Sequence, residues 1–140
     1  MGLEVVTDIG GLVTTNPTAA DSKNQGDDHF RLIKTCLVNL SRQVLHVVTT
    51  YSGTAVTAIA GEIANCTNAG LVTYTLPASP TAGDLYGVCF QNGGITNVVA
   101  RNGNNITGAA ANLTASAAQT KIVLRVRYVD VTMGYVLEAY

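Results

Sequence analysis

The chain has 140 residues, of which 47 % are hydrophobic and 12 % are charged, and its formal net charge is −1. This length fits one folded unit with appendages. Nucleic-acid-binding proteins usually carry clustered Lys and Arg, so the charge balance argues against nucleic acid as a partner. A surface with so few charges does little to keep copies apart, and we therefore expect the chain to associate with itself.

Residues 1–26 are the first predicted segment. They contain Gly10-Gly11, Asn16-Pro17 and a run of small polar residues, which favour extended or turning backbone over a helix. We expect an extended arm that gains order only when it docks on a partner.

A helix is predicted for residues 27–48. Asp27 and Asp28 place negative charge where a helix N-terminus favours it, and Asn24 or Asp27 can serve as the N-cap. A metal site made of Asp27, Asp28 and His29 is disfavoured, because neighbouring residues of a helix point about 100° apart and do not converge on one ion.

Apolar residues within this helix recur at alternating spacings of three and four, which is the pattern of a heptad seam. The series is Phe30, Ile33, Leu37, Leu40, Val44 and Val47. One stripe of the helix is therefore predicted to be buried, either on the chain's own sheet or against identical helices around a symmetry axis. So short a series does not decide between these two arrangements.

Residues 49–140 are predicted to form a β-rich module. Residues 49–70 are rich in Thr, Ala, Gly and Ser, and we expect short strands and connections there. Apolar runs separated by Gly, Asn and Pro then predict strands at residues 71–76, 85–91, 95–100, 121–129 and 135–140. Short apolar runs separated by such turn residues predict a small antiparallel sheet or sandwich. The expected fold class is therefore α+β and mainly β.

The strand at residues 121–129 shows the clearest alternation. One face holds Ile122, Leu124, Val126 and Tyr128, and the other holds Val123, Arg125, Arg127 and Val129. This alternation is typical of a half-buried strand. The Arg face is expected to point to solvent or to a subunit boundary. The small residues at positions 109–118 fit neither a helix nor a strand, and close packing between subunits is one interpretation of them.

Four tyrosines have two interpretations. Tyr86, Tyr128, Tyr135 and Tyr140 either pack between strands or form a sugar-binding surface, because aromatic faces stack on sugar rings. Packing is the favoured interpretation.

The three cysteines, Cys36, Cys66 and Cys89, lack the paired spacing of zinc sites and are interpreted as buried small hydrophobic residues.

No catalytic pattern stands out. His29 and His46 have no sequence partner for a catalytic triad, and the chain contains no nucleophile-elbow, zinc-protease or phosphate-loop motif. We expect no enzymatic activity and no cofactor. No apolar stretch approaches the roughly 18 residues of a membrane span, so no membrane insertion is expected.

The block Gly26-Asp27-Asp28-His29-Phe30-Arg31-Leu32-Ile33-Lys34, preceded by Ile9-Gly10-Gly11-Leu12 and Asn16-Pro17, resembles the N-terminal segment of many tail-fibre proteins of tailed phages. In that family an Asn-Pro arm precedes a Gly-Asp-Asp-His-x-Arg-x-Ile-Lys helix near the virion-attached end. The similarity covers about the first third of the chain. Many relatives continue with Asn-Thr-Phe-Pro, which is absent here and implies a longer helix in this chain.

The resemblance implies a homotrimeric structural protein of the virion, assembled in the host cytoplasm, whose arm and helix attach to other tail proteins. It also raises the prospect that Arg31 and Lys34 dock on a partner's carboxylates rather than only solvating the helix. The candidate docking or oligomer-interface residues are Asn16, Pro17, Asp27, Asp28, His29, Phe30, Arg31, Ile33, Lys34, Leu37, Leu40 and Val44.

Two other functions remain open at this point. A capsid decoration (cement) protein that binds the major capsid protein at symmetry axes of the head would use a short chain, low charge and a clamping arm equally well. A carbohydrate-binding module for a host receptor is the third class, although the distal part of this chain is much shorter than that of a long fibre.

Overall fold

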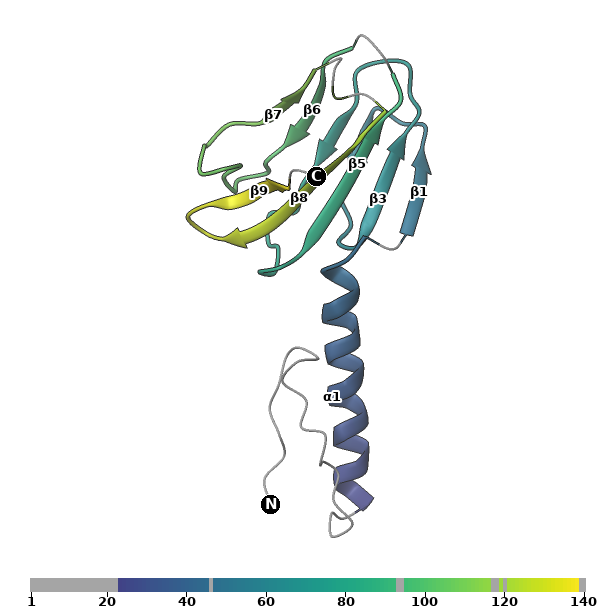
Figure 1. Ribbon diagram of the computed structural model, residues 1–140, viewed down its shortest axis with the longest axis vertical. Helices are drawn as coiled ribbons and strands as arrows, with labels where there is room; N and C mark the ends of the chain where they lie inside the picture. Colours follow the sequence, from purple (N-terminus) through teal and green to yellow (C-terminus); the bar gives the residue numbers. More distant parts are fainter. Residues whose placement is uncertain (1–22, 46, 93–94, 117–118, 120, 139–140) are drawn as a thin grey trace. The chain divides into compact units, whose positions relative to one another are not determined.

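The computed structural model describes residues 23–45, 47–92, 95–116, 119 and 121–138 (Figure 1). These residues form one helix and nine strands: α1 Lys23–Arg42, β1 Val47–Tyr51, β2 Ala55–Thr57, β3 Glu62–Cys66, β4 Thr73–Thr75, β5 Leu85–Phe90, β6 Asn97–Ala100, β7 Leu113–Ala115, β8 Val123–Asp130 and β9 Gly134–Glu138. The expected class, mainly β with one helix, is confirmed. Of the predicted arm, residues 1–22, with Asn16 and Pro17, lie outside the described residues. The prediction is wrong for residues 23–26, which belong to α1.

The chain divides into two compact units, residues 1–41 and residues 42–140. Nearly all of α1 belongs to the first unit, and all nine strands belong to the second. Arg42 is the last residue of α1 and the first residue of the second unit.

The helix differs from the prediction at both ends. It begins at Lys23 rather than near Asp27, so Gly26 lies inside the helix and no acidic residue lies in the first turn. The helix-dipole explanation for Asp27 and Asp28 is therefore wrong, because that interaction fades beyond the first turn. The helix also ends at Arg42 rather than at residue 48, since the β-branched run from Val47 to Thr50 favours a strand and forms β1.

Two mixed sheets make up the second unit. The order in the first is β1-β3-β5-β8-β9 and in the second β2-β4-β6-β7. The chain passes from one sheet to the other after each of the first five strands, so β1, β3 and β5 pair in parallel, and so do β2, β4 and β6. Only β6–β7, β5–β8 and β8–β9 pair antiparallel among the described strands.

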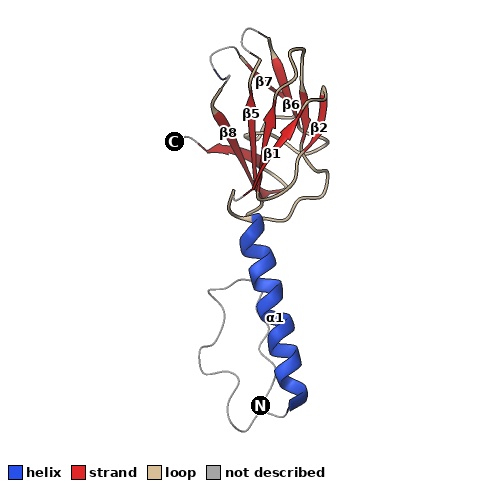
Figure 2. Cartoon of the chain, turned by 90° about the vertical axis from the view of Figure 1, so that its right-hand side faces the viewer, coloured by secondary structure: helices blue, strands red, loops and turns tan. Residues whose placement is uncertain are grey.

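The prediction of an antiparallel sheet is therefore wrong for the first six strands. Parallel neighbours need a crossover connection, which is usually a helix. Here the crossover is a strand of the opposite sheet, reached through the same Gly and Asn turns that hairpins use. Figure 2 shows these strands and their loop connections from a second direction.

Side chains from both sheets form one buried cluster. Tyr74 and Val99 come from the four-stranded sheet, and Tyr86 and Val126 come from the five-stranded sheet; each is at most 1 % exposed. The alternation predicted for this strand is confirmed within β8, since Leu124, Val126 and Tyr128 are buried and the Arg face is only partly covered. It is wrong for Ile122, which precedes β8 and is 49 % exposed. Burial of this one cluster is the main stabilising contribution to the second unit.

The described tyrosines pack inside the module. The ring of Tyr135 lies edge-on to the rings of Tyr86 and Tyr128, with centroid separations of 5.7 Å and 5.3 Å. The Tyr135 hydroxyl donates a hydrogen bond to the carbonyl oxygen of Pro77 at 2.6 Å. Packing is thus confirmed for these three rings, which form no exposed platform for a sugar. Tyr140 lies outside the described residues.

The cysteine prediction is also confirmed. Cys36, Cys66 and Cys89 are buried and form no disulfide. Burial raises the pKa of the Cys66 thiol to about 11, which keeps it protonated at neutral pH.

The small-residue segment at positions 109–118 contains a short strand. β7 runs from Leu113 to Ala115 and pairs antiparallel with β6. Ala115 is 1 % exposed and belongs to the core cluster. The small side chain of Ala115 therefore fills space within its own module.

Candidate oligomer interface

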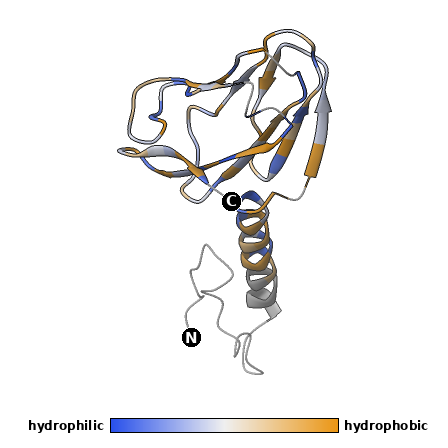
Figure 3. Ribbon diagram, turned by 45° about the horizontal axis from the view of Figure 1, so that its top comes forward, coloured by the Kyte–Doolittle hydropathy of each residue, from blue (hydrophilic) through white to orange (hydrophobic). Residues whose placement is uncertain are grey.

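The heptad seam of α1 is exposed in the single chain. The exposed fractions are 66 % for Phe30, 40 % for Ile33, 50 % for Leu37 and 39 % for Leu40. Figure 3 shows hydrophobic colouring along the helix. These four side chains repeat at heptad spacing and so lie along one stripe of α1. The predicted seam is wrong for Val44 and Val47, because α1 ends at Arg42 and both residues lie beyond it.

The predicted burial of this stripe is not found within one chain. No described helix residue belongs to the core cluster, which draws on strands and their connections. The two sheets bury their apolar faces against each other, whereas the seam retains its exposure. Because α1 and the strands fall in separate compact units, the choice between packing on the chain's own sheet and packing on identical helices stays a prediction.

The other faces of α1 behave differently. Cys36, beside the seam, is 0 % exposed, and the Thr35 hydroxyl donates to the carbonyl oxygen of Arg31 at 3.0 Å. Val38 lies off the seam and is 57 % exposed, which makes it a useful comparison for Leu37.

The polar candidate residues divide into three groups. Arg31 and Lys34 are exposed on α1, where a partner can reach them. Residues 27–29 lie in the helix, but their side chains are outside the described part of the structure, as are Asn16 and Pro17. The structure therefore places the apolar candidates Phe30, Ile33, Leu37 and Leu40 on one stripe of α1 and Val44 beyond its end, and it leaves the acidic pair, His29 and the arm untested.

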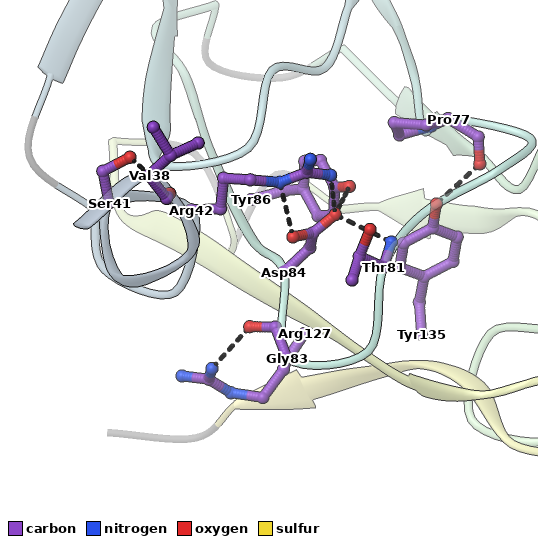
Figure 4. Close-up of polar contacts among 10 residues, drawn as sticks. All are labelled: Val38, Ser41, Arg42, Pro77, Thr81, Gly83, Asp84, Tyr86, Arg127 and Tyr135. Carbon is purple, nitrogen blue, oxygen red and sulfur yellow. Dashed lines mark hydrogen bonds and ion pairs between the residues drawn. The ribbon is translucent and has the colours of Figure 1, made fainter. Parts of the chain in front are cut away.

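A buried ion pair at the end of α1 was missed from the sequence. Asp84 is 2 % exposed, and Figure 4 shows the groups around it. Its carboxylate accepts hydrogen bonds from Arg42 Nε at 2.8 Å and Arg42 Nη2, from the Thr81 N–H at 2.9 Å and from the Tyr86 hydroxyl at 3.1 Å. These four donors satisfy a charge that would otherwise be costly to bury.

The pKa values of Arg42 and Tyr86 are both raised in this cluster. The hydrogen bond to Asp84 raises the pKa of the Arg42 guanidinium. Burial, followed by the nearby charge of Asp84, raises the pKa of the Tyr86 hydroxyl. The cluster ties the end of α1 to the start of β5. The available sequence signal was a lone acidic residue directly before a fully apolar strand.

A second buried polar group, at the start of β6, bonds to the residue before β4 and to the loop after β5. Asn97 is 0 % exposed; its side-chain oxygen accepts from the Val72 N–H at 2.9 Å, and its amide nitrogen donates to Asn92 Oδ1 at 2.7 Å. This arrangement satisfies the amide locally and offers no open site for a ligand.

Two further observations concern metal-ligand clusters and membrane-spanning helices among the described residues. They contain no group of three or more His, Cys, Asp or Glu side chains placed to hold a metal ion. Within the same residues, no helix has both the length and the apolar character needed to cross a membrane.

Comparison with known proteins adds no relative, because no family model and no curated protein matches this chain. The exposed seam is thus the strongest functional feature.

Proposed function

We propose that this chain is a structural protein of a tailed-phage virion, which assembles as a homotrimer along the α1 seam and attaches to the tail through its N-terminal arm and helix. The observation that carries the proposal is the exposure of four seam residues on α1, Phe30, Ile33, Leu37 and Leu40. Hydrophobic stripes of this kind are unusual on a soluble single chain and mark contact surfaces.

The energetics favour association of identical helices. Fully burying one large apolar side chain stabilises a protein by about 1.5–3 kcal/mol, and the seam side chains are between 39 % and 66 % exposed. Each therefore offers roughly 1 kcal/mol in a packed seam. An isolated helix of this length is marginal in water, so packing against its copies would also stabilise the helix itself.

The number of copies follows from the resemblance rather than from the seam. Leu37 following Ile33 favours three or four helices, but one such pair in a helix that ends at Arg42 does not fix the number. The tail-fibre resemblance selects three.

The shared core of the two sheets supports a β-sandwich for the distal module. In the proposed assembly this module extends or closes the fibre, and the arm and helix hold it to the particle.

The attachment is tested on particles. A virion stock made with tagged full-length chain is compared with one made with a chain lacking residues 1–22, which leaves the described helix intact. We expect the full-length chain at the tail in immunogold images and the truncated chain to be missing from particles. Label on the head would instead identify a capsid decoration protein, and normal incorporation of the truncated chain would contradict arm-mediated docking.

A further inference from the structure

The connection from β6 to β7 begins with a tight turn at residues 101–104. The Asn104 N–H donates to the carbonyl oxygen of Arg101 at 3.2 Å, which closes a four-residue β-turn. The two central residues, Asn102 and Gly103, both have positive φ, of +47° and +96°. Positive φ at both central positions defines the type I′ turn, in which Asn followed by Gly is a preferred pair.

The Asn102 side chain is free in this turn. Asn102 and Gly103 are exposed, and no described residue forms a hydrogen bond with the Asn102 amide. Arg101 Nη1 holds the other side of the turn, through the carbonyl oxygens of Gly103 at 2.9 Å and Asn104 at 3.1 Å. A Cβ atom at Gly103 would meet nothing within 4 Å, so no neighbouring group shields this part of the backbone.

The chain contains a second Asn-Gly pair, Asn92-Gly93, whose asparagine is held. The Asn92 amide nitrogen donates to the carbonyl oxygen of Gly70 at 2.6 Å and to Asn97 Oδ1 at 3.1 Å. Asn92 Oδ1 accepts a further hydrogen bond from the Asn97 amide at 2.7 Å, and Asn97 is 0 % exposed. The same dipeptide therefore occurs once with a restrained side chain and once with a free one.

We propose that Asn102 is a self-modification site, at which the neighbouring Gly103 amide converts the asparagine to aspartate and isoaspartate, while Asn92 is protected. The inference does not depend on the proposed function or on the α1 seam, because every residue in it belongs to the second unit.

The reaction needs only water as a co-reactant. The Gly103 backbone nitrogen attacks Cγ of Asn102; the new C–N bond closes a cyclic imide, and the bond from Cγ to the side-chain nitrogen breaks. Ammonia leaves with the proton that the Gly103 N–H gives up. Water then adds to one imide carbonyl and breaks its C–N bond. Attack on the side-chain carbonyl leaves aspartate, and attack on the main-chain carbonyl leaves isoaspartate.

The turn favours this chemistry in two ways. Glycine has no Cβ atom to shield its nitrogen from the attacked carbon. Rotation of Asn102 into the attack geometry opens only an exposed turn, because residues 101–104 do not belong to the core cluster. Each conversion adds one carboxylate, so the formal net charge of the chain changes from −1 to −2.

Ageing of the purified full-length chain tests the proposal. The folded protein is incubated at neutral pH and body temperature in water enriched in heavy oxygen, and samples are taken over several weeks. Peptide mass spectrometry reads Asn102 and Asn92 separately, because each converted residue takes up one oxygen atom from the solvent. A parallel sample in denaturing urea gives the two rates when neither side chain is held. Asn102→Gln is the matched control, since the longer glutamine side chain forms its cyclic imide far more slowly.

In the folded protein we expect Asn102 to convert at least about tenfold faster than Asn92, because Asn92 must first break its hydrogen bonds. In urea the two rates should be similar. Isoelectric focusing should show an acidic species that grows with time in the unsubstituted chain and much more slowly in Asn102→Gln. Similar rates at the two positions in the folded protein would overturn the proposal. So would a folded sample in which Asn102 stays intact while the urea sample converts.

Discussion

Replacing Leu37 with aspartate should dissociate the assembly without unfolding the β module. Leu37 lies in the middle of the seam and is 50 % exposed in the single chain. In the separated chain the carboxylate would stay hydrated, so the substitution should cost about 1 kcal/mol, mostly through lower helix propensity and lost contacts. In a packed seam each buried carboxylate would lack a partner and cost several kcal/mol.

The difference between these two costs, about 3 kcal/mol or more per chain, corresponds to at least a hundredfold weaker association. Size-exclusion chromatography with light scattering measures the mass, and circular dichroism melts measure the β module. Val38→Asp is the matched control, because Val38 is 57 % exposed on the same helix but lies off the seam. It should leave the mass unchanged.

A Leu37→Asp protein with normal mass and stability would refute the reasoning, because it would show that the stripe faces solvent in the assembled state. Simultaneous loss of mass and β signal would instead show that assembly and folding form one cooperative transition. The proposed independence of the module from the seam would then be wrong.

Three further predictions concern the second unit. Arg42→Ala should lower the free energy of unfolding, measured by chemical denaturation, by about 2–3 kcal/mol. The substitution leaves the buried Asp84 carboxylate without its ionic partner, although water reaches part of the vacated site. Arg42→Lys should recover part of this loss in the same measurement. Gly134→Ala should cost at least about 3 kcal/mol, since φ is +68° and a Cβ atom would lie 2.1 Å from a backbone oxygen. Gly103→Ala, with φ of +96° and open space around it, should cost about 1 kcal/mol in the same thermal melts. Finally, burial raises the pKa of the Cys66 thiol from its ordinary value of 9.0 to about 11. The unfolded chain therefore releases this proton at lower pH than the folded chain does, so the contribution of Cys66 to stability should be complete below pH 9 and lost as the pH rises to 11. A free energy of unfolding that increases over this range would contradict the assignment.

Strand positions could be predicted because local pattern and burial agree there. The apolar run predicted at residues 85–91 became β5, Leu85–Phe90, and the alternation from Leu124 to Tyr128 matches the two faces of β8. The way the strands connect could not be predicted. Gly and Asn turns look the same whether the chain folds back into a hairpin or crosses to another sheet, and only the register of distant strands separates the two.

The candidate interface shows a similar division. Heptad spacing located Phe30, Leu37 and Leu40 on one stripe, and the structure places them there with their side chains exposed. Spacing alone could not say whether that stripe faces the same chain or another. The Arg42–Asp84 pair escaped detection because its members are 42 residues apart and neither lies in a recognisable motif.

The mass of the purified full-length chain in solution tests the central claim most directly, since the account depends on the α1 seam joining copies. Light scattering at micromolar concentration should give three times the 14.5 kDa mass of one chain, with the circular dichroism of a mainly β protein. A natively folded protein with the mass of one chain would contradict the account.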